Sequence, residues 1–145
     1  MKRIENSRIL FMDSAPLIRL LEYHPDYYPI VSKVLDSVYE RASKLVFSAV
    51  TLHLVAHRAY EKKNPVLARQ YQEFFSRSRL VMTREVDFSI AAAAAEYRAE
   101  HHMTFEESLQ LATAYHTGAD TVLTENESWK DYLDVPVVTL QDLAE

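Results

Sequence analysis

The sequence has 145 residues, none of which is cysteine and only one of which is glycine. The lack of cysteine excludes a disulfide framework and a thiolate metal site, and it favours a reducing compartment such as the cytoplasm. A single glycine excludes the glycine-rich loop that cradles nucleotide phosphates in many enzymes. The first apolar run is short and stops at Asp13, so we expect neither a signal peptide nor a membrane span.

Hydrophobic residues make up 48% of the chain, which fits one globular domain over residues 1–145. The net charge of −5 is unevenly distributed. Seven basic and two acidic residues lie between Arg58 and Arg84, whereas thirteen acidic and two basic residues follow from Glu85 onward. The basic segment could contact phosphates and the acidic segment could hold a metal ion. Two solvated helices of opposite charge explain the same pattern, so both interpretations stay open.

Short apolar segments alternate with helical patterns along the chain. The strand-like segments are "RILFM", "KLVFS", "RLVMT", "DTVLT" and "VPVVTL". Between them, apolar residues recur at spacings of three and four, as in Ile30, Val34 and Val38. This alternation predicts an α/β fold with three layers (α/β/α), in which a parallel sheet of four or five strands is covered by helices on both faces. The functional crevice of such a sheet lies at the carboxyl ends of the strands.

Polar side chains gather where these strands end. They are Asp13 and Ser14 after the first strand, Thr124, Glu125 and Asn126 after the fourth, and Glu106 and Glu107 at the start of a helix that opens at Thr104. Convergent carboxylate oxygens bind Mg²⁺ or Mn²⁺, and such a cation promotes attack of water on a phosphodiester. The sequence therefore suggests a site for a divalent cation at the carboxyl edge of the sheet.

Each of these residues also has a structural explanation. Glu107 lies three residues after Thr104, which is the spacing of a capping box. Asn126 is a good N-cap for the helix that follows it, and Asp13 could cap the helix after the first strand. Capping and cation binding are both consistent with the sequence at all three positions.

The segments "ILFMDSAPLIRLLE", "FSAVTLHLVAHRA" and "TFEESLQLATAYHTGADTVLTENESW", followed by "VPVVTL", resemble the PIN domain, and in particular the compact VapC-type toxins. The resemblance spans essentially the whole chain in the same order and spacing. Its most specific part is "SLQLATAYHTGADTVLTEN", which is similar to the family's helix, Gly-Ala-Asp turn, strand and Thr-Asn-Asp ending. The resemblance implies an α/β/α fold, Mg²⁺- or Mn²⁺-dependent ribonuclease activity, a small antitoxin partner and a dimer.

The resemblance also implies which residues form the site. The family's first aspartate and the Ser or Thr after it match Asp13 and Ser14. The glutamate of its "TLxE" pattern falls at Leu54, and the aspartate of its "DALxLATA" pattern falls at Glu107. The final aspartate of "TND" falls at Asn126. Asp13 and Glu107 are then the catalytic carboxylates, with Asn126 as a third ligand, and the loss of two acids makes a weak or absent cation site the expectation.

Other residues have supporting roles in this interpretation. Thr124 keeps the family's threonine, and Glu125 replaces its asparagine. His57 lies one turn after Leu54 and could partly replace the missing acid, because helical side chains lean toward the helix N-terminus. His53 and His57 have the spacing of a Zn²⁺ pair, but no third ligand is evident. The candidate RNA contacts are Arg58, Lys62 and Lys63.

Two functions are consistent with these features. The first is a cytoplasmic VapC-like ribonuclease that acts on or binds RNA, with nuclease activity weakened by the loss of acids. The alternative is a non-catalytic module that uses the same scaffold to bind RNA or a protein. An antitoxin-like partner and a homodimer are expected, the dimer because Tyr71, Phe74 and Phe75 offer apolar helix faces. No association with membranes is expected.

Overall fold

The computed structural model describes residues 1–145, with every side chain apart from that of Lys2. Five strands form one parallel sheet. They are β1 (Ile9–Met12), β2 (Lys44–Ser48), β3 (Val81–Arg84), β4 (Thr121–Thr124) and β5 (Val137–Thr139). Their order across the sheet is β3-β2-β1-β4-β5, so β1 is the central strand.

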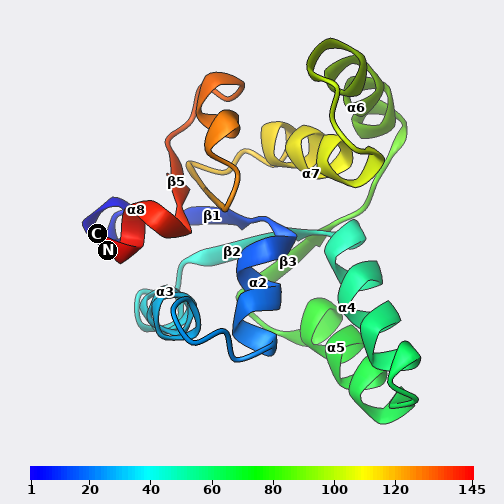
Figure 1. Ribbon diagram of the computed structural model, residues 1–145. Coiled ribbons are helices and arrows are strands. Elements are labelled where there is room, and N and C mark those ends of the chain that lie inside the picture. The colour runs from blue at the N-terminus through cyan, green and yellow to red at the C-terminus, as the bar shows by residue number, and fades with distance from the viewer.

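Helices cover both faces of this sheet (Figure 1). On one face lie α2 (Ser14–Leu21), α3 (Tyr28–Glu40), α4 (Ala49–Glu61) and α5 (Pro65–Arg77). On the other lie α7 (Phe105–His116) and the 3₁₀ helix η1 (Glu127–Asp131), with α6 (Phe88–His101) packed on α7. The short helices α1 (Lys2–Glu5) and α8 (Leu140–Ala144) lie near each other at the two ends of the chain. The α/β/α fold predicted from the sequence is confirmed.

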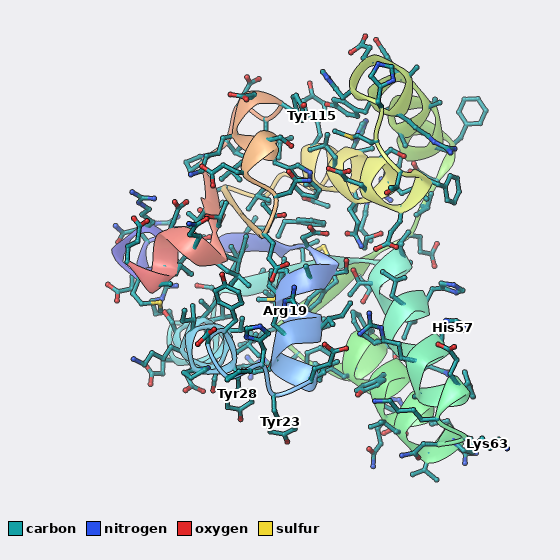
Figure 2. All side chains as sticks on the ribbon, viewed as in Figure 1. Arg19, Tyr23, Tyr28, His57, Lys63 and Tyr115 are labelled. Atoms are coloured by element: carbon teal, nitrogen blue, oxygen red, sulfur yellow. The ribbon has the colours of Figure 1, made fainter. Side chains whose placement is uncertain are left out.

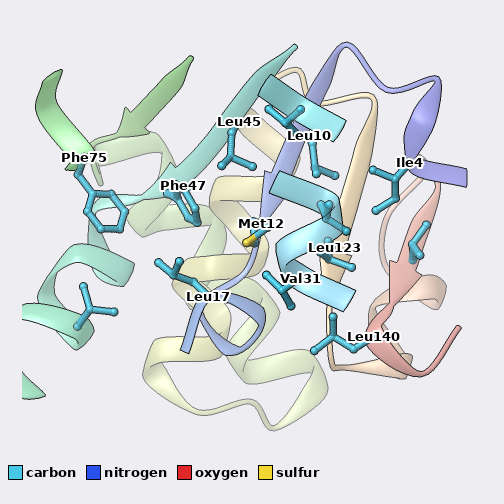
Figure 3. Close-up of a cluster of buried hydrophobic side chains, with 14 residues drawn as sticks. Ile4, Leu10, Met12, Leu17, Val31, Leu45, Phe47, Phe75, Leu123 and Leu140 are labelled. Atoms are coloured by element: carbon cyan, nitrogen blue, oxygen red, sulfur yellow. The ribbon is translucent and has the colours of Figure 1, made fainter. Parts of the chain in front are cut away.

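Two hydrophobic clusters hold the layers together because successive strand side chains point to opposite faces. Leu10 and Met12 of β1 belong to the cluster that contains Leu45 and Phe47 of β2 (Figure 3). Phe11, which lies between Leu10 and Met12, belongs to the opposite cluster with residues of α7 and η1. The ends of β1 and β4 are therefore fixed by packing on both faces of the sheet.

The aromatic residues of α5 are mostly covered. Phe75 is 3% exposed and lies edge-on to Phe47 at 5.1 Å between ring centroids. Phe74 and Tyr71 are partly buried against the same cluster. These rings therefore give little support to the dimer expected from them, because the chain's own core accounts for much of their apolar surface. None of the helices in the described chain is long and apolar enough to cross a membrane.

Three short elements go beyond the sequence pattern. The first helix α1 has only four residues, too few for a periodic pattern. The helix expected after the Asn126 cap is a 3₁₀ helix, Glu127–Asp131. The chain's last element is α8, in which Thr139 and Asp142 form a capping box. Such a reciprocal cap stabilises a helix that is too short to be stable by propensity alone.

Asp120, in the Gly-Ala-Asp turn, ties the start of β4 to the start of β1. Its carboxylate accepts hydrogen bonds from Ser7 Oγ at 2.5 Å and from the backbone amides of Arg8 and Ile9 at 2.9 and 3.1 Å. Partial burial acts to raise the pKa of Asp120, but these hydrogen bonds outweigh it and hold the pKa below its ordinary value. The turn therefore sets the register of the two strands whose other ends carry the polar residues.

We expect Asp120→Asn to lower the free energy of unfolding by about 1 kcal/mol at pH 7, because an amide accepts these hydrogen bonds less strongly than a carboxylate. The lowered folded-state pKa means that the contribution of Asp120 is present above the unfolded-state value and is lost as the pH falls through the folded-state value. Urea denaturation should show a smaller difference in free energy of unfolding between variant and wild type below pH 4 than at pH 7. The exposed Asp26→Asn is the matched control.

Candidate functional site

The carboxyl ends of β1 and β4 meet where the strand order changes direction, since the chain continues from β1 to one edge through β2 and to the other through β4. Met12 of β1 pairs with Leu123 of β4. The next residues, Asp13 and Thr124, are joined by a hydrogen bond of 2.8 Å from Thr124 Oγ1 to Asp13 Oδ2. Open α/β sheets bind their ligands in the crevice at such a point.

A cavity of about 490 Å³ lies at this edge of the sheet. Its lining comes from the start of α2, the start of α7 and the loop after β4, and consists of Asp13, Ser14, Ala15, Thr104, Glu106, Glu107, Gln110, Glu125, Asn126 and Glu127. Five of these residues are acidic and none is basic. A cavity with this lining has a negative potential that attracts cations.

Asp13 is buried and has two hydrogen-bond donors. Ser14 N donates to Oδ1 at 2.8 Å, which caps α2, and Thr124 Oγ1 donates to Oδ2. Burial nevertheless raises the pKa of Asp13 to about 6, with the nearby Glu106 and Glu107 adding to the effect and the two hydrogen bonds opposing it. Capping alone would lower this pKa, so Asp13 is held in a place where its charge is unfavourable.

Glu107 forms only half of the capping box predicted for it. Its backbone amide donates to Thr104 Oγ1 at 3.1 Å. Its carboxylate instead accepts hydrogen bonds from Trp129 Nε1, at 3.2 Å, and from Asn126 Nδ2. Trp129 is fully buried, so it fixes the direction of this carboxylate. Glu107 is therefore held toward the loop after β4 and the cavity.

Asn126 caps η1 and bridges to Glu107. Its Oδ1 accepts hydrogen bonds from Ser128 N at 3.1 Å and from Ser128 Oγ at 2.5 Å, and its Nδ2 donates to the Glu107 carboxylate. An aspartate here would place a second carboxylate against Glu107, and the two charges would need a cation between them. The neutral amide joins the same two elements without one.

Glu125 and Glu106 complete the acidic lining. Glu125 forms an ion pair with Arg19, in which Nε lies 2.6 Å from Oε1, and Arg19 Nη2 donates to Oε2 at 3.3 Å. Its charge is therefore already balanced. Ser14 Oγ lies 3.5 Å from Glu106 Oε1. Glu106 was noticed in the sequence but not selected as a site residue, although its place beside Glu107 in the first turn of α7 was the available signal.

His57 is not brought to this cavity. It lies on the outer side of α4 with its side chain 60% exposed, and Nδ1 is 3.5 Å from Glu61 Oε1 (Figure 2). Its ring stacks on that of His53. Leu54, one turn earlier, is partly buried and also does not line the cavity. A role for His57 in place of the missing acid finds no support in its position.

Of the candidate RNA-binding residues, Arg58 lies in the last turn of α4, and Lys62 and Lys63 follow the helix. Arg58 forms an ion pair with Glu22. Lys62 and Lys63 are exposed just after α4 ends, and Lys63 is far out on the molecule in Figure 2. These cations are accessible to a phosphate chain, but none of them lines the acidic cavity.

The donor atoms at the cavity fit a hard divalent cation in kind, because they are carboxylate and amide oxygens. The lining also includes Gln110, whose buried Oε1 has no hydrogen-bond partner. Nowhere among the described residues, however, do three acidic or histidine side chains come close enough together to hold a metal ion. A cation at this cavity would have to rely on Asp13 and Glu107 together with neutral oxygens.

No protein-family model and no curated protein matches the sequence. Solved structures do match the fold. VapBC2 from Rickettsia felis, bound to a promoter DNA fragment, is 14% identical with a TM-score of 0.68, over 90% of this chain and 98% of that chain. A toxin–antitoxin complex from Klebsiella pneumoniae is 20% identical with a TM-score of 0.63, over 90% and 97%.

The FitAcB structure from Neisseria gonorrhoeae is 22% identical with a TM-score of 0.65, over 91% of this chain and 98% of that chain. Identities this low establish the fold and leave the chemistry to the residues of the site. Nearly the full length of each matched chain is covered, so the likeness concerns the whole domain. The protein has the PIN-domain fold of the VapC-type toxins.

Proposed function

We propose that the protein is a VapC-like endoribonuclease that depends on Mg²⁺ or Mn²⁺ and has weakened activity, acting in the cytoplasm. The observation that carries the proposal is the acidic cavity at the carboxyl ends of β1 and β4, where four further acidic residues and no basic residue line the cavity together with Asp13. A raised pKa at a buried carboxylate in a cleft is typical of a functional group, because packing alone would not place a charge there.

Asp13 and Glu107 would hold the cation, with Glu106 beside them. When bound, such a cation supplies Lewis-acid chemistry that promotes attack of water on a phosphodiester. Ser14 N and Thr124 Oγ1 fix both oxygens of Asp13, and Trp129 and Asn126 fix the carboxylate of Glu107. The two carboxylates are therefore oriented before a cation binds, which lowers the entropic cost of binding.

Exposed cations near the C-terminal end of α4 favour RNA as the substrate. Lys62 and Lys63 are free to contact phosphates on the outside of the molecule, and Arg58 shares its charge with Glu22. The acidic cavity itself repels phosphates, so the phosphodiester would approach only when a cation is present.

The solved structures that this chain resembles are toxin–antitoxin complexes, and we extend that context to it. A small antitoxin-like protein is the partner proposed here, together with a homodimer. Light scattering at micromolar concentrations tests the dimer, since a single-chain mass throughout would contradict it.

A non-catalytic binding module is the second candidate because of a groove at the C-terminal end of α2. A cavity of about 570 Å³ there is lined mainly by aliphatic and aromatic residues of α2, α3 and α5 and their connections, among them Tyr23, Tyr28, Tyr39 and Tyr71. Tyr23 is 74% exposed and stacks on Tyr28 at 5.0 Å (Figure 2). Exposed tyrosines are common where a protein binds a partner.

Titration with Mn²⁺ separates the two candidates. We expect the wild type to take up Mn²⁺ at millimolar concentrations in calorimetry and to cut single-stranded RNA slowly, and we expect Asp13→Asn, which can retain the cap of α2, to lose both. Asp26→Asn serves as the control. If the wild type gives neither heat nor a thermal shift with millimolar Mn²⁺, the nuclease proposal fails and the binding module is preferred.

A further inference from the structure

Gln110 is a buried polar residue with an unused acceptor. It lies on α7 with 1% of its surface exposed. Its Nε2 donates a hydrogen bond of 2.8 Å to Thr51 Oγ1. Its Oε1 is the one buried side-chain nitrogen or oxygen, among the side chains that the structure describes, that has no hydrogen-bond partner. An acceptor in this state is unfavourable, and a donor or a cation is what would satisfy it.

Gln110 also belongs to the lining of the acidic cavity. Gln110 lies three residues after Glu107 and four after Glu106, so the three side chains share one face of α7. All three line the cavity. The site thus has an uncharged oxygen on the same helix face as two of its carboxylates.

The hydrogen-bond partner of Gln110, Thr51, gives a further reason to connect Gln110 with the site. Thr51 lies on α4, three residues before Leu54, where the resemblance to the PIN domain expects a glutamate. Residues three apart on a helix lie on neighbouring turns of the same side. Gln110 therefore extends from α7 to the part of α4 that lacks its acid.

We propose that Gln110 is a neutral ligand of the divalent cation, binding it through Oε1 together with Asp13 and Glu107 and partly compensating for the acid missing at Leu54. The inference rests on the function proposed above. An amide oxygen is a suitable donor for Mg²⁺ or Mn²⁺. It also adds no charge to a cavity that already holds five acidic residues, so the carboxylates of the cation-free protein repel one another less than they would with a sixth acid.

A purely structural role for Gln110, as a link between α4 and α7, makes the opposite prediction for one substitution. Gln110→Met keeps the length of the side chain and removes both polar atoms. If Oε1 is a ligand, Mn²⁺ affinity should fall by roughly tenfold or more. The stability of the cation-free protein reports separately on the hydrogen bond from Nε2 to Thr51 Oγ1, which the substitution also removes. If the link to Thr51 is what matters, stability falls and Mn²⁺ affinity does not change.

The experiment measures Mn²⁺ binding by calorimetry and by the electron paramagnetic resonance signal of free Mn²⁺, with urea denaturation of each protein in EDTA. The variants are Gln110→Met, Gln110→Glu and Asp13→Asn, and the control is Gln70→Met on the exposed side of α5. Gln110→Glu keeps an oxygen and adds a charge, so it should bind Mn²⁺ more tightly than the wild type and be less stable in EDTA.

The outcomes separate this inference from the proposed function. Wild-type affinity in Gln110→Met, with binding lost in Asp13→Asn, would overturn the role of Gln110 and leave the cation site intact. No Mn²⁺ uptake by the wild type would overturn both. Should Gln110→Met lose stability and affinity together, Gln110→Glu decides: retained or tighter binding supports an oxygen ligand, and loss in both variants overturns it.

Discussion

Restoring two acids, by Leu54→Glu together with Asn126→Asp, is expected to tighten Mn²⁺ binding strongly and to produce or increase Mn²⁺-dependent cleavage of single-stranded RNA. The affinity of an oxygen site depends on the number of charged ligands, and the double variant would return carboxylates to both positions where the resemblance to the PIN domain expects them. Calorimetry measures the affinity, and a labelled single-stranded RNA reports cleavage.

The structure makes this pair of substitutions feasible. Leu54 is only partly buried and belongs to neither large core cluster, so a glutamate there can keep part of its hydration. At position 126, an aspartate can still accept the hydrogen bonds from Ser128 N and Oγ that cap η1. The substitution removes only the donor that now faces the Glu107 carboxylate.

Loss of that donor predicts a second signature of the double variant. Two carboxylates would then meet at the position now bridged by Asn126, and their repulsion should make the protein less stable than the wild type in EDTA. Because a cation binds only the folded state tightly, added Mn²⁺ should restore stability in a concentration-dependent way. Thermal melts followed by circular dichroism, with and without Mn²⁺, measure both effects.

Leu54→Gln with Asn126 unchanged is the matched neutral control, since it has the shape of glutamate without its charge. Adding Asp13→Asn to the double variant should abolish both binding and cleavage. A double variant that folds but neither binds Mn²⁺ nor cuts RNA would mean that the site has diverged in more than its ligands. The tyrosine-lined groove beside α2 would then become the main candidate for function.

Much of the site's position could be predicted from the sequence because the information is local. An apolar strand that stops at Asp13 and another that stops at Thr124 each place a polar residue at a strand end, and parallel strands bring such ends together. The structure joins these two residues directly. The reduced number of acids likewise needed only the identities of Leu54 and Asn126.

Contacts between distant segments could not be predicted in the same way. The spacing from Thr104 to Glu107 indicates a capping box, but the carboxylate pairs with Trp129 and Asn126, which local spacing does not reveal. The spacing of His57 suggests a site residue, yet the face of α4 that carries Val55 and Ala59 packs against the core. His57 lies on the other face and points to solvent. Helix rotation depends on tertiary packing, and packing decides which polar residue reaches the cavity.

Replacing the central carboxylate should stabilise the protein. A folded-state pKa of about 6 for Asp13, against an ordinary value of 3.8, means that ionisation is less favourable in the folded chain than in the unfolded chain. A difference of this size corresponds to about 3 kcal/mol at neutral pH. Asp13→Asn removes the charge and keeps an oxygen that accepts from Ser14 N, while its Nδ2 can donate to Thr124 Oγ1 in place of the bond that Thr124 now donates. We therefore expect the free energy of unfolding to rise by about 1–3 kcal/mol at pH 7.

The pH dependence identifies the cause of this gain. Well below pH 3.8 Asp13 is protonated in both states, so its charge has no effect on stability. As the pH rises from about 4 to 6, the unfolded chain loses the proton before the folded chain does, and the wild type loses stability relative to the variant. Above the folded-state value the difference is complete, so it should be large at pH 7 and only a small part of that at pH 4.

Asp120→Asn provides the control of opposite sign, because the pKa of Asp120 is lowered and that variant should be less stable than the wild type at pH 7. Urea denaturation of both variants from pH 4 to 8 in EDTA gives the comparison, and addition of Mn²⁺ should then stabilise the wild type but not Asp13→Asn. If Asp13→Asn is destabilised at pH 7, hydrogen bonding dominates at Asp13 and its carboxylate is a helix cap. If it is stabilised at neutral pH and insensitive to Mn²⁺, the protein maintains an unfavourable buried charge at the point where the cation is proposed to bind.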